Sequence, residues 1–199
     1  MRITASAQAS LAVGTAIAGV VLISWVAAAG ADGFGLFAFL VRLLHILAAM
    51  VWIGLVVFVN FVQLAALQGA DDPSRAYLHK AVVPFVAWWF RHASTVAVAS
   101  GAILLVTAGY VLPALVYGSS VYVPPARATL LWGGVIGALA MWMLVHMFIW
   151  PSMQVALGLR PGNADARTQA RARVAIFARL NLILAVPVTL AMVAAAHLY

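Results

Sequence analysis

Five apolar segments, each about 20 residues or longer, restrict this chain to folds that cross a lipid bilayer. They cover residues 11–30, 36–67, 82–112, 128–150 and 174–198. Only 8% of the residues are charged, whereas a soluble domain has about 25%. We therefore expect an all-α integral membrane protein, a five-helix transmembrane bundle that forms a single membrane domain over residues 1–199.

The first apolar segment has features of both a signal peptide and a transmembrane helix. Its end, Ala27 to Ala31, resembles a signal-peptidase site. The apolar run is longer than the usual core of a signal peptide. We therefore expect segment 11–30 to be retained as a transmembrane helix.

Polar residues, prolines and glycines predict where the other segments begin and end. Segment 36–67 is about 48 Å long as a helix, so it must tilt or project from the bilayer. Asp71-Asp72-Pro73-Ser74 predicts a helix start. Segment 128–150 is expected to end at Pro151 and to pack through Gly133 and Gly137. Residues 151–173 are expected to form a basic loop, and Pro187 is expected to bend the last helix.

The arginines predict the orientation of the bundle. The net charge of +7 does not indicate nucleic acid, because the basic residues lie near segment ends, where they direct topology. With the N-terminus inside, only Arg42 and Arg127 lie near the outer side. The cytoplasmic side then holds Arg2, Arg75, Lys80, Arg160, Arg167, Arg171 and Arg173. This predicts a cytoplasmic N-terminus and a periplasmic C-terminus.

The second segment carries an arginine and a histidine, Arg42 and His45, on one helical face. Ionisable groups within a membrane helix are functional-site candidates, because burying them is costly. Small residues surround His45, and Trp52 lies two turns along. This pattern suits a haem whose iron binds the imidazole and whose propionate binds the guanidinium. Alternatively, His45 bonds a neighbouring helix and Arg42 extends to the interface.

The remaining histidines extend this hypothesis. His45 and His197 lie toward the outer side and predict one haem, whereas His92 and His146 lie toward the inner side and form a second candidate pair. His79 is expected to be solvated. The chain has no cysteine, so any haem is held non-covalently, as haem b. We expect one haem per chain, or two if His92 and His146 bind a second haem.

Copper is an alternative metal for the inner pair. The methionines near His146 supply soft thioether ligands that suit copper(I): Met141, Met143, Met147 and Met153. Methionines also fill irregular gaps between helices, so the two interpretations remain open.

Short motifs follow one another in order from the second segment to the C-terminus: Arg42-x-x-His45, Trp52-Ile-Gly54, Asn60-Phe-Val-Gln63, Trp88-Trp-Phe-Arg91, Ile149-Trp150-Pro151, Arg179-x-Asn181, Pro187 and His197. Over residues 36–199 this pattern resembles the N-terminal membrane domain of bacterial membrane-bound urate oxidases (urate hydroxylases) and their stand-alone relatives. In the fused members, the resemblance implies transfer of electrons to an attached c-type cytochrome domain. The first two motifs are also similar to membrane families linked to protoporphyrinogen oxidation and to copper resistance.

These features together predict a b-type haem membrane protein in electron transfer, multi-pass in the bacterial inner membrane. Its expected partners are membrane lipid, quinone or a periplasmic cytochrome c, and a second copy or a larger membrane complex. With no cysteine or glutamate, and four aspartates expected in loops, any catalysis would be oxidoreductase chemistry carried by haem. The alternatives are a copper-handling protein and an accessory subunit of a respiratory-type complex.

The predicted topology is directly testable with reporter fusions. Residues 69–80 and 155–170 should report a cytoplasmic location, and residues 113–127 and Tyr199 an external one. A cytoplasmic C-terminus would contradict the assignment, because an odd number of spans places the two termini on opposite sides.

Overall fold

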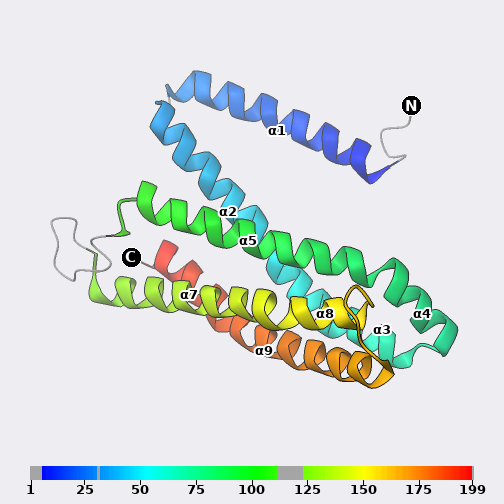
Figure 1. Ribbon diagram of the computed structural model, residues 1–199. Helices are drawn as coiled ribbons and strands as arrows, with labels where there is room; N and C mark the ends of the chain where they lie inside the picture. The colour runs from blue at the N-terminus through cyan, green and yellow to red at the C-terminus, as the bar shows by residue number, and fades with distance from the viewer. Residues whose placement is uncertain (1–5, 31, 112–122, 199) are drawn as a thin grey trace. The chain divides into compact units, whose positions relative to one another are not determined.

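The computed structural model describes residues 6–30, 32–111 and 123–198, and every regular element within these ranges is a helix (Figure 1). Five helical stretches are long and apolar enough to cross a membrane, which is the number of long apolar helices that the sequence predicts. The chain divides into two compact units, residues 1–40 and 41–199.

The first unit contains α1 (Ala7–Ala29) and the start of α2 (Gly33–Phe58). The Ser6 side chain accepts a hydrogen bond from the backbone of Ala9 and begins α1 four residues before the predicted segment. Gly30 ends α1 in the left-handed conformation, at φ 62°, which suits glycine. None of the described residues of α1 is buried, so its apolar surface faces outward all round.

The second predicted segment is confirmed as one long helical stretch, Gly33–Gly69. It contains α2, the π-helix η2 (Val59–Gln63) and α3 (Leu64–Gly69). π-Helical turns are rare and occur frequently at functional sites. This one carries Asn60 and Gln63.

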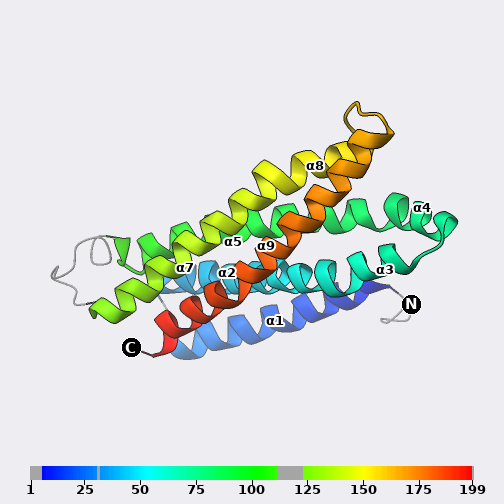
Figure 2. The ribbon, with the colours of Figure 1, turned by 90° about the horizontal axis from the view of Figure 1, so that it is seen from below.

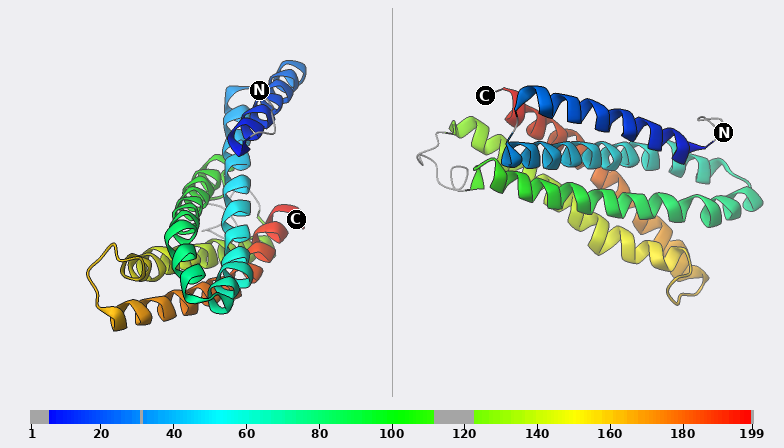
Figure 3. Two further views of the ribbon diagram at one scale, coloured as in Figure 1. Left: turned by 90° about the vertical axis from the view of Figure 1, so that its right-hand side faces the viewer. Right: turned by 90° about the horizontal axis from the view of Figure 1, so that it is seen from above.

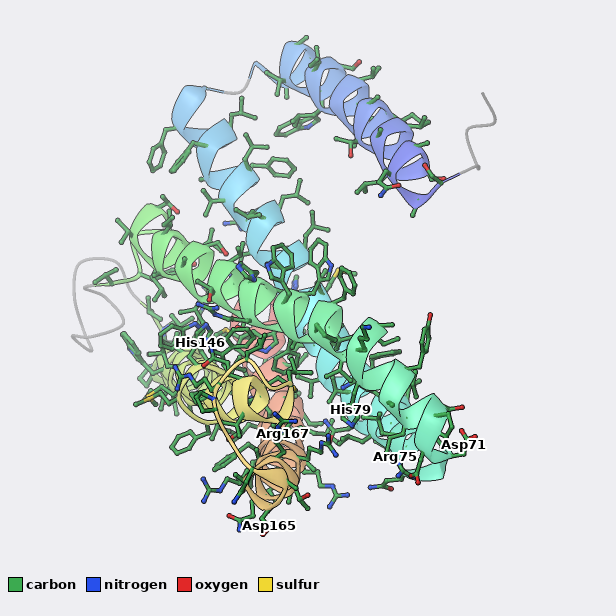
Figure 4. The ribbon with its side chains drawn as sticks, turned by 45° about the vertical axis from the view of Figure 1, so that its right-hand side comes forward. Asp71, Arg75, His79, His146, Asp165 and Arg167 are labelled. Carbon is green, nitrogen blue, oxygen red and sulfur yellow. The ribbon has the colours of Figure 1, made fainter. Side chains whose placement is uncertain are left out.

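The predicted helix start at Asp71 is confirmed. The Asp71 carboxylate accepts a hydrogen bond from the backbone of Ser74 at 3.2 Å and begins α4 (Asp72–Ala81). Hydrogen bonds from the Ser74 side chain and backbone lower the pKa of Asp71 below its ordinary value. Arg75 fixes the turn before α4, because its guanidinium donates to the carbonyls of Leu67 and Ala70 and pairs with Asp72 at 2.8 Å (Figure 4).

α5 (Val83–Thr107) follows α4 directly, and the predicted loop after it lies mostly outside the described residues. α7 (Pro125–Met143) continues through the π-helix η3 (Leu144–Ile149) into α8 (Trp150–Ala156). The expected end at Pro151 is therefore wrong. The Trp150 N–H bonds the Val145 carbonyl, five residues back, as in a π-helix. Pro151 follows as the second residue of α8, and the helix continues through it to Ala156.

The last helix, α9 (Ala164–His197), begins ten residues before the predicted segment 174–198. Asn163 caps its start by accepting from the backbone of Ala166 at 2.8 Å. Alanine and arginine are strong helix formers, so residues 164–173 are helical rather than loop. Asp72 and Asp165, also expected in loops, lie in first helical turns. α9 continues through Pro187.

Within the second unit, α7, η3 and α8 lie along α9 (Figures 1 and 2). The α3–α4 turn and the α8–α9 loop lie at one end of this unit, and the end of α9 lies at the other (Figure 3). The inner face of α9 is made of small residues such as Ala178 and Ala185, whereas Ile183, Val186 and Leu190 face outward. Small residues inside and large apolar residues outside are typical of membrane helix bundles.

Glycines allow α7 to approach α9 closely. A Cβ on Gly137 would overlap Cγ2 of Val188, and one on Gly134 would lie 3.1 Å from the Met192 sulfur. Gly133, expected to share the packing face with Gly137, has open space around it. The contact therefore uses Gly134 and Gly137, three residues apart.

We predict opposite effects for alanine at two of these glycines. Gly137→Ala should lower thermal stability in detergent, because overpacking against the stiff side chain of Val188 costs about 1–3 kcal/mol. Gly133→Ala is the matched control and should be neutral or stabilising by up to about 1 kcal/mol, from helix propensity alone. Equal melting temperatures for the two variants would contradict this packing.

Candidate functional site

His45 of α2 contacts the middle of α5. Its Nδ1 lies 2.8 Å from the carbonyl oxygen of Ala97 and 3.4 Å from the Ser100 hydroxyl. A carbonyl only accepts hydrogen bonds, so Nδ1 donates its proton to Ala97. The tautomer with its proton on Nδ1 carries a lone pair on Nε2, and Nε2 forms no hydrogen bond with another described residue. This is the tautomer of metal-ligating histidines, whose second nitrogen commonly donates to a backbone carbonyl.

Gly101 gives the imidazole of His45 the space it occupies. A Cβ on Gly101 would lie 2.9 Å from Cε1 and 3.2 Å from Nδ1 of His45. These separations are too short for ordinary contact, so a side chain at this position would displace the ring. Gly101 therefore sets the position of His45 as much as the Ala97 carbonyl does.

His146 lies in the π-helix η3, and both of its ring nitrogens have protein partners. Nδ1 lies 3.0 Å from the Trp142 carbonyl, and Nε2 lies 3.0 Å from the Thr95 hydroxyl of α5. The ring stacks on Trp142 at 4.4 Å. By contrast with His45, His146 would have to give up the Thr95 contact to bind a metal.

His92 is exposed on α5 and stacks on Trp88, with ring centroids 4.1 Å apart. Its Nδ1 lies 2.7 Å from the Trp88 carbonyl. His92 and His146, the expected inner pair, form no hydrogen bond or ring contact with each other among the described residues. Thr95 lies one turn from His92 and contacts His146. The structure brings the two histidines to one region without joining them.

The two helices that carry His45 and His146 meet α5 at nearly one level. Their partners Ala97 and Thr95 are two residues apart, about 3 Å along the helix axis. Two residues also correspond to about 200° of rotation, so the histidines contact opposite faces of α5. From the sequence, we expect His45 toward the outer side and His146 toward the inner side. In the structure both side chains contact residues in the middle of α5.

The other predicted site residues have fewer contacts. His197, in the last turn of α9, is exposed, and no hydrogen bond or ring contact is recorded for it within residues 6–30, 32–111 and 123–198. Arg42 is exposed and has no recorded ion pair in the same ranges. Trp52 is buried in the core at 3% exposure, and its indole N–H has no partner among the described residues.

The methionines proposed as copper ligands do not face one way. Met141 and Met153 are buried in the core, whereas Met143 and Met147 are exposed. The described residues contain no cluster of three or more histidine, cysteine or acidic groups suited to a metal. The arrangement thus gives the copper interpretation no added support.

A buried polar layer of Asn60, Gln63 and Asn181 connects η2, α7 and α9. From the sequence, these residues stand out only as parts of motifs. Asn181 is fully buried, and its Nδ2 donates to the Met141 carbonyl at 3.0 Å. Asn60 donates through Nδ2 to the carbonyls of Val56 and Ala178, at 2.8 and 3.1 Å. Amides within apolar helices usually face the interior, and this rule could have identified the layer.

In the described part of the chain, three side-chain acceptors on η2 and α9 lack partners. The side-chain oxygens of Asn60, Gln63 and Asn181 are buried and unpaired among the described residues. The nitrogens of Asn60 and Asn181 must point at carbonyls, so neither amide can flip to relieve its oxygen. An unpaired buried acceptor costs about 1–3 kcal/mol, so this layer is suited to bound water or to a ligand with N–H or O–H groups.

Comparison of the chain with protein-family models, with curated proteins and with solved structures finds no match. The chemistry of the site therefore rests on the geometry of its own residues.

We predict that the polar layer stabilises the helix packing. Asn181→Ala and Asn60→Ala should each lower the free energy of unfolding by about 1–3 kcal/mol, because each removes an interhelical bond in an apolar interior. The double variant should be non-additive, since Asn60 contacts the turn of α9 that carries Asn181. Thermal unfolding in detergent measures both effects. Gln68→Ala, an exposed amide in α3, is the control and should change nothing.

Proposed function

We propose that this protein is a b-type haem membrane protein that transfers electrons, with His45 as an iron ligand. The observation that carries the proposal is the hydrogen bond between His45 Nδ1 and the Ala97 carbonyl. With the proton on Nδ1, the lone pair lies on Nε2, where it can bind iron, and the bond to Ala97 holds the ring in one orientation. Metal-ligating histidines commonly fix their second ring nitrogen in this way.

The neighbouring residues fit such a group. Arg42 lies one turn before His45, is exposed, and is free of recorded ion pairs in the described residues, so its guanidinium is available to a propionate. Gly101 and Ala97 line the ring of His45 with minimal bulk. Haem, when bound, supplies one-electron redox chemistry. The chain would supply the ligand and the countercharge.

His197 is the proposed second ligand. Its exposed ring has no recorded competing bond in the described residues, so it can turn toward iron. Arg127 Nε donates to the Ala195 carbonyl at 2.9 Å and ties the end of α9 to α7. His146 is less suited to this role, because its Nε2 contacts Thr95. A second haem between His92 and His146 would require those contacts to rearrange.

The proposed orientation places the N-terminus in the cytoplasm and the C-terminus in the periplasm of a bacterial inner membrane. Charge asymmetry in the second unit supports it, because the end with the α3–α4 turn and the α8–α9 loop carries most of the cationic residues (Figure 3). The proposed electron partners are quinone and a periplasmic cytochrome c.

We predict that His45→Ala abolishes the low-spin haem spectrum of the purified protein, because it removes the iron ligand. His197→Ala should leave haem weakly bound or high-spin, since one ligand remains. Gly101→Val should weaken haem binding with both histidines present, because the valine displaces the His45 ring. Optical spectra of the oxidised and reduced proteins measure all three effects.

His79→Ala is the matched control and should keep the wild-type spectrum, because His79 lies in α4, away from the proposed ligands. Pyridine haemochrome titration counts the haems, and two per chain would add the inner pair. A folded His45→Ala protein with an unchanged low-spin spectrum would overturn the assignment of His45.

A further inference from the structure

A cavity of about 330 Å³ lies between α8, the loop that follows it and the first turns of α9. Two arginines line it, Arg160 from the loop and Arg173 from α9, and Ser152 and Gln169 add neutral polar groups. The haem proposal uses none of these residues. The cavity is therefore a separate candidate binding site.

The loop that holds Arg160 is fixed by backbone hydrogen bonds. The N–H groups of Leu159 and Arg160 both donate to the Gln154 carbonyl, at 2.8 and 3.1 Å. Gly158 adopts the left-handed conformation at φ 75°, which favours glycine and turns the chain out of α8. Arg160 therefore begins from a defined backbone position at the mouth of the cavity.

Among the described residues, the arginines around this cavity form no ion pair with a carboxylate. The ion pair found there joins Arg75 to Asp72 in α4. Arg167 lies across the loop, its Nη2 3.6 Å from where a Cβ on Gly158 would be. Asp165 is the acidic residue of the first turn of α9, and Figure 4 labels both Asp165 and Arg167. Arg160, Arg167 and Arg173 outnumber this one carboxylate, so this part of the protein carries a net positive charge.

We propose that this cavity binds a phosphate group, carried either by an anionic phospholipid or by free inorganic phosphate. Each guanidinium group can bind phosphate oxygens through two parallel hydrogen bonds, so Arg160 and Arg173 together can hold one phosphate from two directions. The Ser152 hydroxyl and the Gln169 amide can donate to the remaining oxygens. Val155, Pro161 and Ala170 form an apolar wall that suits the glycerol and acyl portion of a lipid.

Native mass spectrometry of the full chain, delipidated in neutral detergent, tests this site with three probes. Phosphatidylglycerol carries the phosphate on a lipid, diacylglycerol lacks it, and inorganic phosphate lacks the lipid. Wild-type protein should bind phosphatidylglycerol and not diacylglycerol. Competition by inorganic phosphate at equal concentration would identify the free anion as the ligand, and its failure to compete would identify the lipid. Equal binding of the two lipids would overturn the proposal.

Paired variants separate this site from general positive charge. Arg160→Gln with Arg173→Gln should weaken binding of the phosphate-bearing probe about tenfold or more, because two charge-assisted contacts are lost. Arg171→Gln with Lys80→Gln removes the same amount of charge from residues outside the cavity lining. This control should change binding by less than about twofold, because it removes no charge-assisted contact with the phosphate. Equal weakening in both double variants would overturn the proposal. Matching melting temperatures verify that both double variants are folded.

Discussion

Polar side chains inside the bundle bind backbone carbonyls of neighbouring helices, and the packing of the second unit depends on these bonds. His45 joins α2 to α5, Asn60 joins η2 to α9, Asn181 joins α9 to α7, and Arg127 joins α7 to α9. A helical carbonyl already accepts one intrahelical bond, but its oxygen has a second lone pair. In an apolar interior such acceptors are the nearest partners for a donor that has left water.

This way of connecting helices also determines what remains reactive. The bonds of His45, Asn60 and Asn181 to carbonyls use only a donor atom, so each bond orients its side chain without using the acceptor atom of that side chain. In His45 the free atom is Nε2, a metal-binding nitrogen, and in Asn60 and Asn181 it is the amide oxygen. His146 differs, because Thr95 occupies its second nitrogen. The bonds that stabilise the bundle thus distinguish a candidate ligand from a structural histidine.

The two π-helices lie where these polar contacts concentrate. η2 carries Asn60 and Gln63, and η3 carries His146. Both contact α9. A wider turn changes which side chains face the interior, because each additional residue per turn rotates the residues that follow. Locally altered helices in membrane proteins are tolerated where protein groups satisfy them, and here they place polar side chains inside an otherwise apolar bundle.

The amino-acid sequence alone determined the helical class, the five long apolar helices and the cap at Asp71, because apolar length and capping chemistry are local properties. It also identified His45 and Arg42 as unusual within an apolar helix. Only the tertiary structure decided the partners: Asn60 meets a carbonyl 118 residues away, and His45 meets one 52 residues away. It also decided that Pro151 does not end its helix and that Gly134, rather than Gly133, faces α9. These outcomes depend on how each helix is rotated against its neighbours, and packing sets that rotation.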